Sequence, residues 1–311
     1  MAKAVRNENA IGIRRRSRKT LMTGLLFTSP WIIGFFLFQL YPILASFYYS
    51  MTDYNLFTAP EWVGFGNYKK LFQDDKFYLS MYNTLYITVV GVVPHMAYAL
   101  VMALLLNAKV KGQSLYRTVY FLPTLVPAVA GSLLWMWLLN SQYGLINMGL
   151  SAIGITGPNW LVDPDWTKPS LVLMGFWGTG TITVMYLAAL QDVPKMFYEA
   201  AEIDGASKWR QFWTITFPSI SPMTLFQLIM MLISSFQYFT EGLVFAEATQ
   251  STGGPENSLL FYSIYLYQQA FSFLNMGYAS AMAWMLFLVV MFFTLLIFRT
   301  SARWVYYGGE K

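Results

Sequence analysis

The chain of 311 residues carries too few charges for an ordinary water-soluble protein. Charged residues make up 11% of it and hydrophobic residues 56%, whereas soluble domains are about 25% charged. A net charge of +5 does not indicate nucleic-acid binding here, because the basic residues are spread over short segments between apolar runs. The absence of cysteine excludes disulfides and thiolate chemistry. With one histidine and no paired carboxylates at catalytic spacing, we expect neither catalytic residues nor a metal site.

The predicted elements are membrane-spanning helices. A helix needs about 20 predominantly apolar residues to cross a bilayer, and charge-free runs long enough for this recur along the chain. The predicted fold class is therefore all-α, a polytopic membrane bundle of six transmembrane helices. The six predicted spans are 21–50, 81–107, 116–140, 169–191, 215–243 and 276–298.

The first apolar run follows a basic segment that contains Arg14, Arg15 and Arg16. A cleaved signal peptide also begins this way, but its apolar core is only about 7–15 residues long. The run here continues to Met51 and has no convincing small-residue cleavage site. We therefore expect a basic cytoplasmic tail at 1–20. A retained first span and an outer loop are expected over 21–80.

The basic residues also predict the orientation, because Lys and Arg accumulate in short cytoplasmic loops. With the N-terminus in the cytoplasm, the predicted outer loops contain four of the 20 Lys and Arg residues: Lys69, Lys70, Lys76 and Lys168. Both termini are therefore predicted to be cytoplasmic. The other five spans form a predicted core over 81–300, which leaves 301–311 as a cytoplasmic tail.

The inner loop between the fourth and fifth spans is predicted to form two short helices. Pro194 suits the first turn of a helix, and Gly205 can adopt the left-handed conformation that ends one. Ser207 can then cap a second helix. We expect the first helix at 195–206, projecting into the cytoplasm and rigidly joined to the fifth span. A surface-lying linker without a partner is the alternative.

This loop also carries a spaced motif. Glu199-Ala200-Ala201 is followed after three residues by Gly205, after nine more by Ile215, and then, one residue later, by Phe217-Pro218. The pattern resembles the EAA motif of ABC importer permeases, in which Leu is usual in place of Phe217. A large apolar side chain is retained there, so we expect coupling to be retained as well.

The resemblance extends over most of the chain and points to the carbohydrate-uptake branch of these permeases. The segments that carry it are Tyr41-Pro42, Phe65-Gly66-Asn67-Tyr68, Asn83-Thr84, Thr252-Gly253-Gly254-Pro255 and Arg303-Trp304-Val305-Tyr306-Tyr307. The resemblance implies a multi-pass protein of the bacterial inner membrane. Its function would be uptake of a sugar or oligosaccharide by alternating access.

The same resemblance implies how the work is divided among subunits. The helix at 195–206 would be a coupling helix seated in a groove of an ATP-binding subunit. The chain has no phosphate-binding loop of its own, so ATP and Mg would be held by that partner, and this chain would bind no cofactor. Implied partners are a second homologous permease, two ATP-binding subunits, an extracytoplasmic solute-binding protein and membrane lipid, with no nucleic acid. The implied coupling residues are Glu199, Ala200, Ala201, Asp204, Gly205, Ile215 and Pro218.

Polar residues inside spans predict the solute path, because they are costly in lipid and usually face a bundle interior. The candidates in the fifth span are Gln237, Tyr238 and Glu241, and those in the fourth are Trp177, Thr179 and Thr181. As alternatives, Glu241 lies at the level of the lipid headgroups, and the threonines bond their own helix backbone. His95 is expected to pack or to form a hydrogen bond between helices.

Other functions remain as alternatives. A glycerol-phosphate permease of the same family would want buried Lys or Arg for its solute, and the predicted spans have none away from their ends. An independent secondary transporter would carry buried ion-coupling residues and internal repeats, neither of which is evident. A membrane enzyme lacks candidate catalytic groups here.

Overall fold

The computed structural model describes residues 2–307, with side chains from Arg18 onward. The predicted tails at 1–20 and 301–311 therefore lie partly outside the described residues. The regular secondary structure of the described part is helical apart from β1 (Thr52–Asp53) and β2 (Glu61–Trp62), an antiparallel pair that sets Thr52 opposite Trp62. The all-α prediction thus holds except for this small hairpin.

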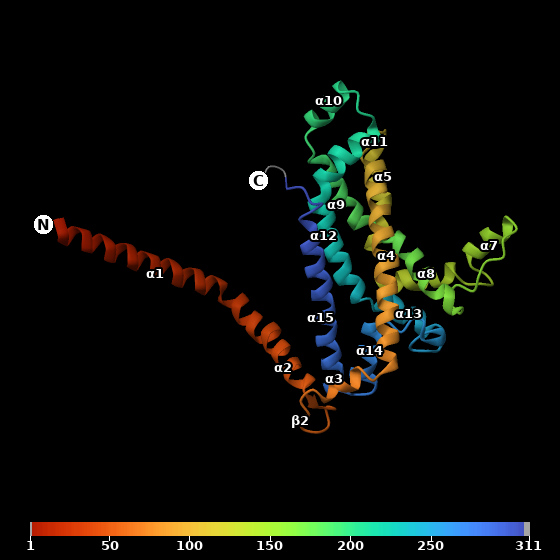
Figure 1. Cartoon of the computed structure of the whole chain (residues 1–311), viewed down its shortest axis with the longest axis horizontal. Coiled ribbons are helices and arrows are strands. Elements are labelled where there is room, and N and C mark those ends of the chain that lie inside the picture. Colours follow the sequence, from red (N-terminus) through yellow and green to blue (C-terminus); the bar gives the residue numbers. More distant parts are fainter. Residues whose placement is uncertain (1, 308–311) are drawn as a thin grey trace.

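Long helices form the body of the molecule, and shorter ones connect and cap them (Figure 1). The long helices of the body are α4 (Asp75–Asn107), α12 (Phe217–Phe236) and α15 (Met276–Ser301), and α1 (Ala2–Phe35) and the shorter α2 (Tyr41–Ser50) precede them. The shorter ones are α3 (Gly66–Leu71), α5 (Gln113–Phe121), α6 (Ala128–Leu138), α7 (Leu145–Ala152), α8 (Pro164–Trp177), α9 (Gly180–Gln191), α10 (Lys195–Ile203), α11 (Lys208–Gln211), α13 (Thr240–Glu247) and α14 (Tyr262–Tyr267).

Four stretches are long and apolar enough to cross a membrane as they stand: Arg18–Ser50, Asp75–Asn107, Lys208–Glu247 and Met276–Ser301. They contain the predicted first, second, fifth and sixth spans. The other two predicted spans are bent pairs. Helices α5 and α6 meet at 99°, and α8 and α9 meet at 46°. The described chain therefore has four to six spans, and six only if each bent pair is one crossing.

Prolines lie at three of the irregular points of the helices. Pro123 and Pro127 lie at the break between α5 and α6, where each removes a backbone donor. Two π-helical turns, at Phe36–Leu40 and Phe212–Thr216, lie directly before the pairs Tyr41-Pro42 and Phe217-Pro218. In each case the proline cannot donate to the carbonyl four residues earlier, and the preceding turn widens.

Helix α4 is the central helix of the structure, because it contacts α8, α9, α12 and α14. Two buried apolar clusters lie along it. One includes Phe77 and Ile87 of α4 with Tyr262 of α14, and the other includes Ala99 of α4 with Tyr186 of α9. Helix α1 leaves this body, and the α7 segment projects from the other side (Figure 1).

The Phe65-Gly66-Asn67-Tyr68 segment fastens the end of α2 to α15. The Asn67 amide donates to the Ser50 carbonyl at 3.0 Å and to the Thr52 carbonyl at 2.8 Å. On the other side, the Gly277 amide donates to the Tyr54 carbonyl at 3.0 Å. A Cβ at Gly277 would stand 2.1 Å from the Thr52 oxygen, so only glycine allows this approach.

The Asn83-Thr84 segment of α4 holds the loop that follows α13. The Asn83 amide donates to the carbonyls of Asn257 at 2.9 Å and Leu260 at 3.1 Å. The neighbouring Thr84 hydroxyl accepts the Tyr262 amide at 2.8 Å. The Lys168 ammonium donates to the side-chain oxygen of Asn83 at 2.9 Å. This end of the bundle is thus closed by hydrogen bonds within the chain.

Candidate functional site

A cavity of about 650 Å³ lies between α4, α6, α8, α9, α12 and α13. Its wall includes every residue that the sequence proposes for the solute path: Trp177, Thr179, Thr181, Gln237, Tyr238 and Glu241. The tertiary structure therefore brings together two groups of residues that are about 60 positions apart in the chain.

Two helix breaks place these residues in the wall. Helix α8 ends at Trp177 and α9 begins at Gly180. Helix α12 ends at Phe236 and α13 begins at Thr240, so the predicted fifth span at 215–243 is not one continuous helix. Broken membrane helices are tolerated where the irregular backbone lines a cavity or is buried in protein, and both breaks lie at this cavity.

The hydroxyl of Thr179 is already engaged in the structure. It lies 2.8 Å from the Tyr120 hydroxyl and donates to the Phe176 carbonyl at 2.9 Å. For Thr179 the alternative of bonding its own backbone is therefore correct. Within the described part of the chain, the side chains of Thr181, Gln237 and Glu241 have no hydrogen bond, so their polar groups are available to a solute.

Glu241 is the one charged residue in the described cavity wall. It lies in the first turn of α13, where the partial positive charge of the helix N-terminus favours an anion. No Lys or Arg of the described chain lines the cavity. The wall is thus weakly anionic and otherwise neutral.

His95 of α4 also lines the cavity. Its Nε2 lies 2.8 Å from the Val172 carbonyl of α8, and because a carbonyl can only accept, Nε2 carries the proton. A Cβ at Gly175 would stand 2.3 Å from the imidazole ring, so this glycine makes room for it. The expected hydrogen bond between helices is confirmed, whereas the place of His95 in the cavity wall was not predicted.

Gln227 and Tyr120 are further polar residues near the cavity that the sequence reasoning missed. Gln227 is buried in α12, lines the cavity and contacts the sulfur of Met185. A buried amide in the middle of an apolar span was the available signal. Tyr120 could not be found in this way, because its partner Thr179 lies far along the sequence.

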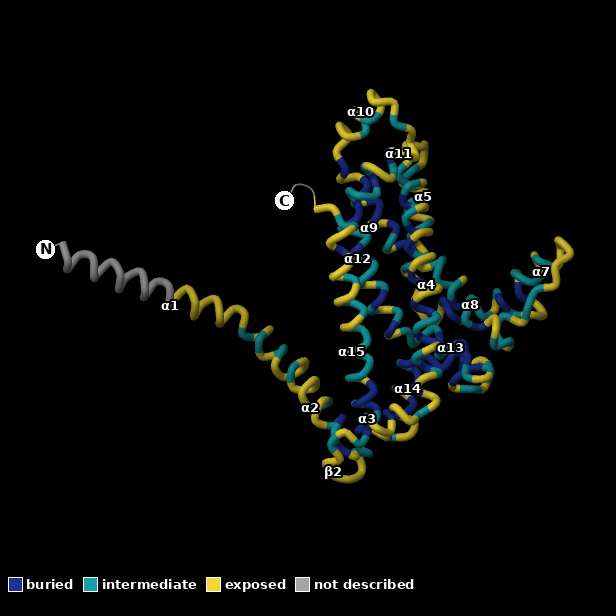
Figure 2. The backbone as a smooth tube through the Cα atoms, viewed as in Figure 1, coloured by how far each residue is buried: buried dark blue, intermediate teal, exposed yellow. Residues whose placement is uncertain are grey.

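Helix α10 projects from the end of the bundle opposite β2 (Figure 1) and has no buried residue (Figure 2). Apolar side chains on it are exposed, with 66% of Met196 and 87% of Ile203 accessible. Glu199 is exposed and has no ion pair or hydrogen bond in the described structure. This apolar surface is what a second protein can cover.

The turn after α10 depends on Gly205. The Ala206 amide donates to the Ala201 carbonyl at 2.9 Å and the Gly205 amide to Glu202 at 3.1 Å, with Gly205 at φ +72°. These bonds end the helix at Ile203, so the predicted end at residue 206 was three residues too late. The expected left-handed glycine is confirmed.

The predicted coupling residues occupy one continuous segment. Glu199, Ala200 and Ala201 lie in α10, and Asp204 caps its C-terminus. Ile215 lies in the second π-helical turn, and Pro218 in the first turn of α12.

Side chains brace this segment. Ser207 caps α11, as expected, by accepting the Arg210 amide at 3.3 Å. Lys208 pairs with Glu202, and the Tyr198 hydroxyl lies 2.9 Å from that of Thr216. Helix α10 is thereby braced against α11 and against the π-helical turn that leads into α12.

Comparison with known proteins finds a family that this chain matches. Residues 95–305 match the sequence model of the family described as "Binding-protein-dependent transport system inner membrane component". The matched range contains the cavity-lining breaks and the segment from Glu199 to Pro218.

Individual proteins match over almost the whole chain. It is 38% identical to "Probable ABC transporter permease protein YesP" of Bacillus subtilis, over 96% of both chains. It is 37% identical to "Lactose transport system permease protein LacF" of Rhizobium radiobacter, over 86% of this chain and 90% of that one. Among solved structures, a bacterial alginate ABC transporter in complex with alginate pentasaccharide-bound periplasmic protein contains a similar chain. The TM-score is 0.79 at 23% identity, over 92% of this chain and 96% of that one.

Proposed function

The chain belongs to the family of binding-protein-dependent transport system inner membrane components, and from this membership we propose that it forms half of the translocation path for a neutral sugar or oligosaccharide. It is a multi-pass inner-membrane permease and the non-catalytic membrane subunit of an ABC importer. The observation that carries the proposal is the single cavity whose wall unites Trp177 and Thr181 with Gln237 and Glu241.

The composition of the cavity supports a neutral solute. Sugars present hydroxyl groups and apolar C–H faces, and the wall offers unpaired amide and hydroxyl groups beside Trp177 and Tyr238. The likeness to the lactose permease supports a saccharide. A glycerol-phosphate solute would want cations for its phosphate, and the described wall has Glu241 as its one charge.

The partners in this proposal are two ATP-binding subunits, a second permease and an extracytoplasmic receptor. ATP and Mg would be bound on the ATP-binding subunits. Helix α1 supports the second permease as a partner, since the most apolar window of Arg18–Ser50 is not buried at all within this chain. Gly24 and Thr28, small residues four positions apart, suit close helix packing in a membrane.

The coupling mechanism in this proposal runs from α10 to the cavity. A partner would cover Met196 and Ile203, and Glu199 would contact its surface. Because α10 is braced against α11 and the π-helical turn that continues into α12, displacement of α10 would be transmitted to α12 and to the break at 237–239. Such motion would open the cavity alternately to each side of the membrane.

The proposed orientation places α10 and both termini in the cytoplasm. Residues 1–20 and 301–311 would then be cytoplasmic tails, and 21–80 would supply the first span and an outer loop. The permease core would be 81–300. The basic residues support this arrangement, because few of them fall on the opposite side.

The proposal is tested by uptake of neutral disaccharides into vesicles that contain the complete importer and its receptor. Gln237→Leu removes an unpaired amide at nearly constant volume and is expected to lower saturated uptake by about threefold to tenfold, the effect of one lost hydrogen bond. Glu247→Gln, on the exposed side of α13 and outside the cavity, is the matched control. Equal uptake by Gln237→Leu and wild type would show that the cavity is not part of the solute path. Transport by this chain alone under an ion gradient would instead indicate a secondary transporter.

A further inference from the structure

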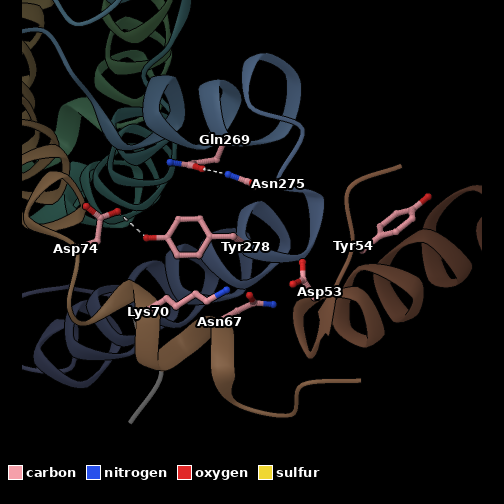
Figure 3. A pocket seen from close by; sticks show the side chains of 8 residues that line it. All are labelled: Asp53, Tyr54, Asn67, Lys70, Asp74, Gln269, Asn275 and Tyr278. Carbon is pink, nitrogen blue, oxygen red and sulfur yellow. Dashed lines mark hydrogen bonds between the residues drawn. The ribbon is translucent and has the colours of Figure 1, made fainter. Parts of the chain in front are cut away.

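A second pocket lies at the end of the bundle that carries β1 and β2, away from the cavity described above (Figure 3). Its volume is about 280 Å³, and every side chain in its wall is polar or carries a hydroxyl. Four segments build it: β1 with the residue after it, α3, the residue before α4, and the start of α15 with the turns before it. The wall consists of Asp53, Tyr54, Asn67, Lys70, Asp74, Gln269, Asn275 and Tyr278.

Several of these groups are already occupied by internal hydrogen bonds. One oxygen of Asp74 accepts the Lys76 amide at 2.9 Å, and the other accepts the hydroxyls of Tyr278, at 2.7 Å, and Tyr265. Gln269 donates to Tyr265 at 2.9 Å and accepts from Asn275 at 3.0 Å. These bonds make the floor of the pocket rigid.

The remaining groups have atoms that no hydrogen bond or ion pair of the described chain uses. The side chain of Asn67 is buried, with 3% of the residue exposed. Its amide nitrogen donates to two backbone carbonyls, which can only accept, so its Oδ1 is left for the pocket. Asn275 likewise uses its nitrogen on Gln269, which leaves its Oδ1. Asp53 and Lys70 have no ion pair in the described part of the chain, although both line the pocket.

The unoccupied groups include three oxygen acceptors, and the charges of the wall sum to a net negative value. The acceptors are the Asp53 carboxylate and the amide oxygens of Asn67 and Asn275. The donors are the Lys70 ammonium, the Tyr54 hydroxyl and the second N–H of Gln269 and of Asn275. The wall holds two carboxylates, Asp53 and Asp74, against one ammonium. A guanidinium group carries five N–H donors and no acceptor, which complements such a set. An incoming carboxylate would meet the two carboxylates of Asp53 and Asp74 and only one ammonium.

We propose that this pocket is a docking socket for a basic side chain, by its donor number an arginine, on the soluble receptor that delivers the solute. The inference rests on the proposed function, in which this end of the bundle faces the receptor. Asp53 provides the opposing charge, Asn67 and Asn275 orient the guanidinium, and Lys70 opposes entry of the cation. The hydrogen bonds of Asp74 hold the pocket in shape before the receptor binds.

A free sugar fits the socket less well. A sugar is neutral and gains nothing from the net negative charge of the wall, which Asp53 and Asp74 set against Lys70. The main cavity, by contrast, offers amide and hydroxyl groups of both kinds next to aromatic rings. We therefore assign the solute to the cavity and the receptor to the socket.

The test measures ATP hydrolysis by the complete importer in lipid nanodiscs as a function of receptor concentration. The receptor is the solute-binding protein encoded with the importer, loaded with its sugar. Asp53→Asn keeps the shape and removes the charge. We expect it to raise the half-saturating receptor concentration about tenfold, with the basal and saturated rates unchanged. Lys70→Met is expected to lower that concentration about threefold, because it removes repulsion. Glu256→Gln, at an exposed acidic residue outside the pocket, is the matched control and should shift nothing.

A small guanidinium compound tests whether the pocket itself, and not the surrounding protein surface, recognises the cation. Methylguanidinium chloride is expected to inhibit receptor stimulation more than the same concentration of tetramethylammonium chloride, and this excess should vanish in Asp53→Asn. A lower half-saturating concentration in Asp53→Asn together with a higher one in Lys70→Met would show that the pocket takes an anion. No shift in either variant would show that the pocket takes no part in docking. Both results overturn the socket. If wild-type hydrolysis does not respond to the receptor at all, the proposed function itself fails, and the socket with it.

Discussion

The two ends of the bundle differ in how their surfaces are completed. At the β1–β2 end, Asn67 and Asn83 are 3% and 0% exposed and tie neighbouring segments to backbone carbonyls. At the α10 end, no residue of the helix is buried and Ile203 stands open. The first end is stable through contacts within the chain, whereas the second presents an apolar surface that only another protein can cover. The difference indicates which end must move with a partner.

The largest expected effect comes from Gly205→Pro. Gly205 has φ +72° and donates a hydrogen bond, whereas proline has φ near −65° and no donor. A cost of about 3 kcal/mol in this turn should displace α10 and lower sugar uptake about 100-fold, with the permease still present in the membrane.

Gly205→Ala is the control for this prediction. A Cβ at this position meets nothing within 4 Å. The substitution therefore costs only the free energy of placing alanine in the left-handed conformation, about 1 kcal/mol. Uptake assays in vesicles distinguish the two variants. Normal uptake in Gly205→Pro would contradict the role of α10 in coupling.

A strong loss of stability is expected at the other end from Gly277→Ala. The added Cβ would lie 2.1 Å from the Thr52 oxygen, and forced shifts of this kind cost about 1–3 kcal/mol or more. The melting temperature of the solubilised protein should fall, while Gly24→Ala, whose Cβ meets nothing within 4 Å, should leave it unchanged. Equal melting of the two variants would show that the β1–β2 end is not held together as described.

Asn83→Ala tests the comparison between the two ends of the bundle, because it removes hydrogen bonds within the chain at the β1–β2 end. The carbonyls of Asn257 and Leu260 would lose their partner, which costs about 1–3 kcal/mol per buried group left unpaired. Ile203→Ser is the counterpart at the other end. It should not change the melting temperature of the isolated chain, but it should weaken binding of the ATP-binding subunits. A larger loss of stability from Ile203→Ser than from Asn83→Ala would reverse the comparison.

The smallest effect is expected from Tyr198→Phe, which removes the hydroxyl contact between α10 and Thr216. Loss of one such hydrogen bond costs about 1 kcal/mol. Coupling, measured as sugar molecules imported per ATP hydrolysed, should fall by less than half. No change would mean that the Glu202–Lys208 pair and the α11 cap suffice to hold α10.

Local signals in the sequence were enough for the parts of the fold that depend on local chemistry. The long apolar runs predicted the first, second, fifth and sixth spans, because a helix in lipid satisfies its own backbone. Gly205 and Ser207 predicted the turn and the cap beside α10, since both depend on neighbours within a few residues. The polar residues near 177–181 and 237–241 were identified from their cost in lipid.

Other features could not be read from local pattern. The breaks after Trp177 and Phe236 turn side chains inward, and no signal in either segment shows that the two breaks face each other. His95 enters the cavity wall because Gly175, 80 positions away, has no side chain. The socket at Asp53 and Lys70 is closed by residues from the start of α15.

The sequence by itself determined that this is a helical membrane protein, where its long helices run, and how α10 ends. These properties follow from hydropathy and from backbone conformations set within one turn. Only the tertiary structure decided that the two polar groups share one cavity and that Asn67 and Asn275 turn their oxygens to a common pocket. Such placements depend on contacts between residues far apart in the chain, and no local preference encodes them.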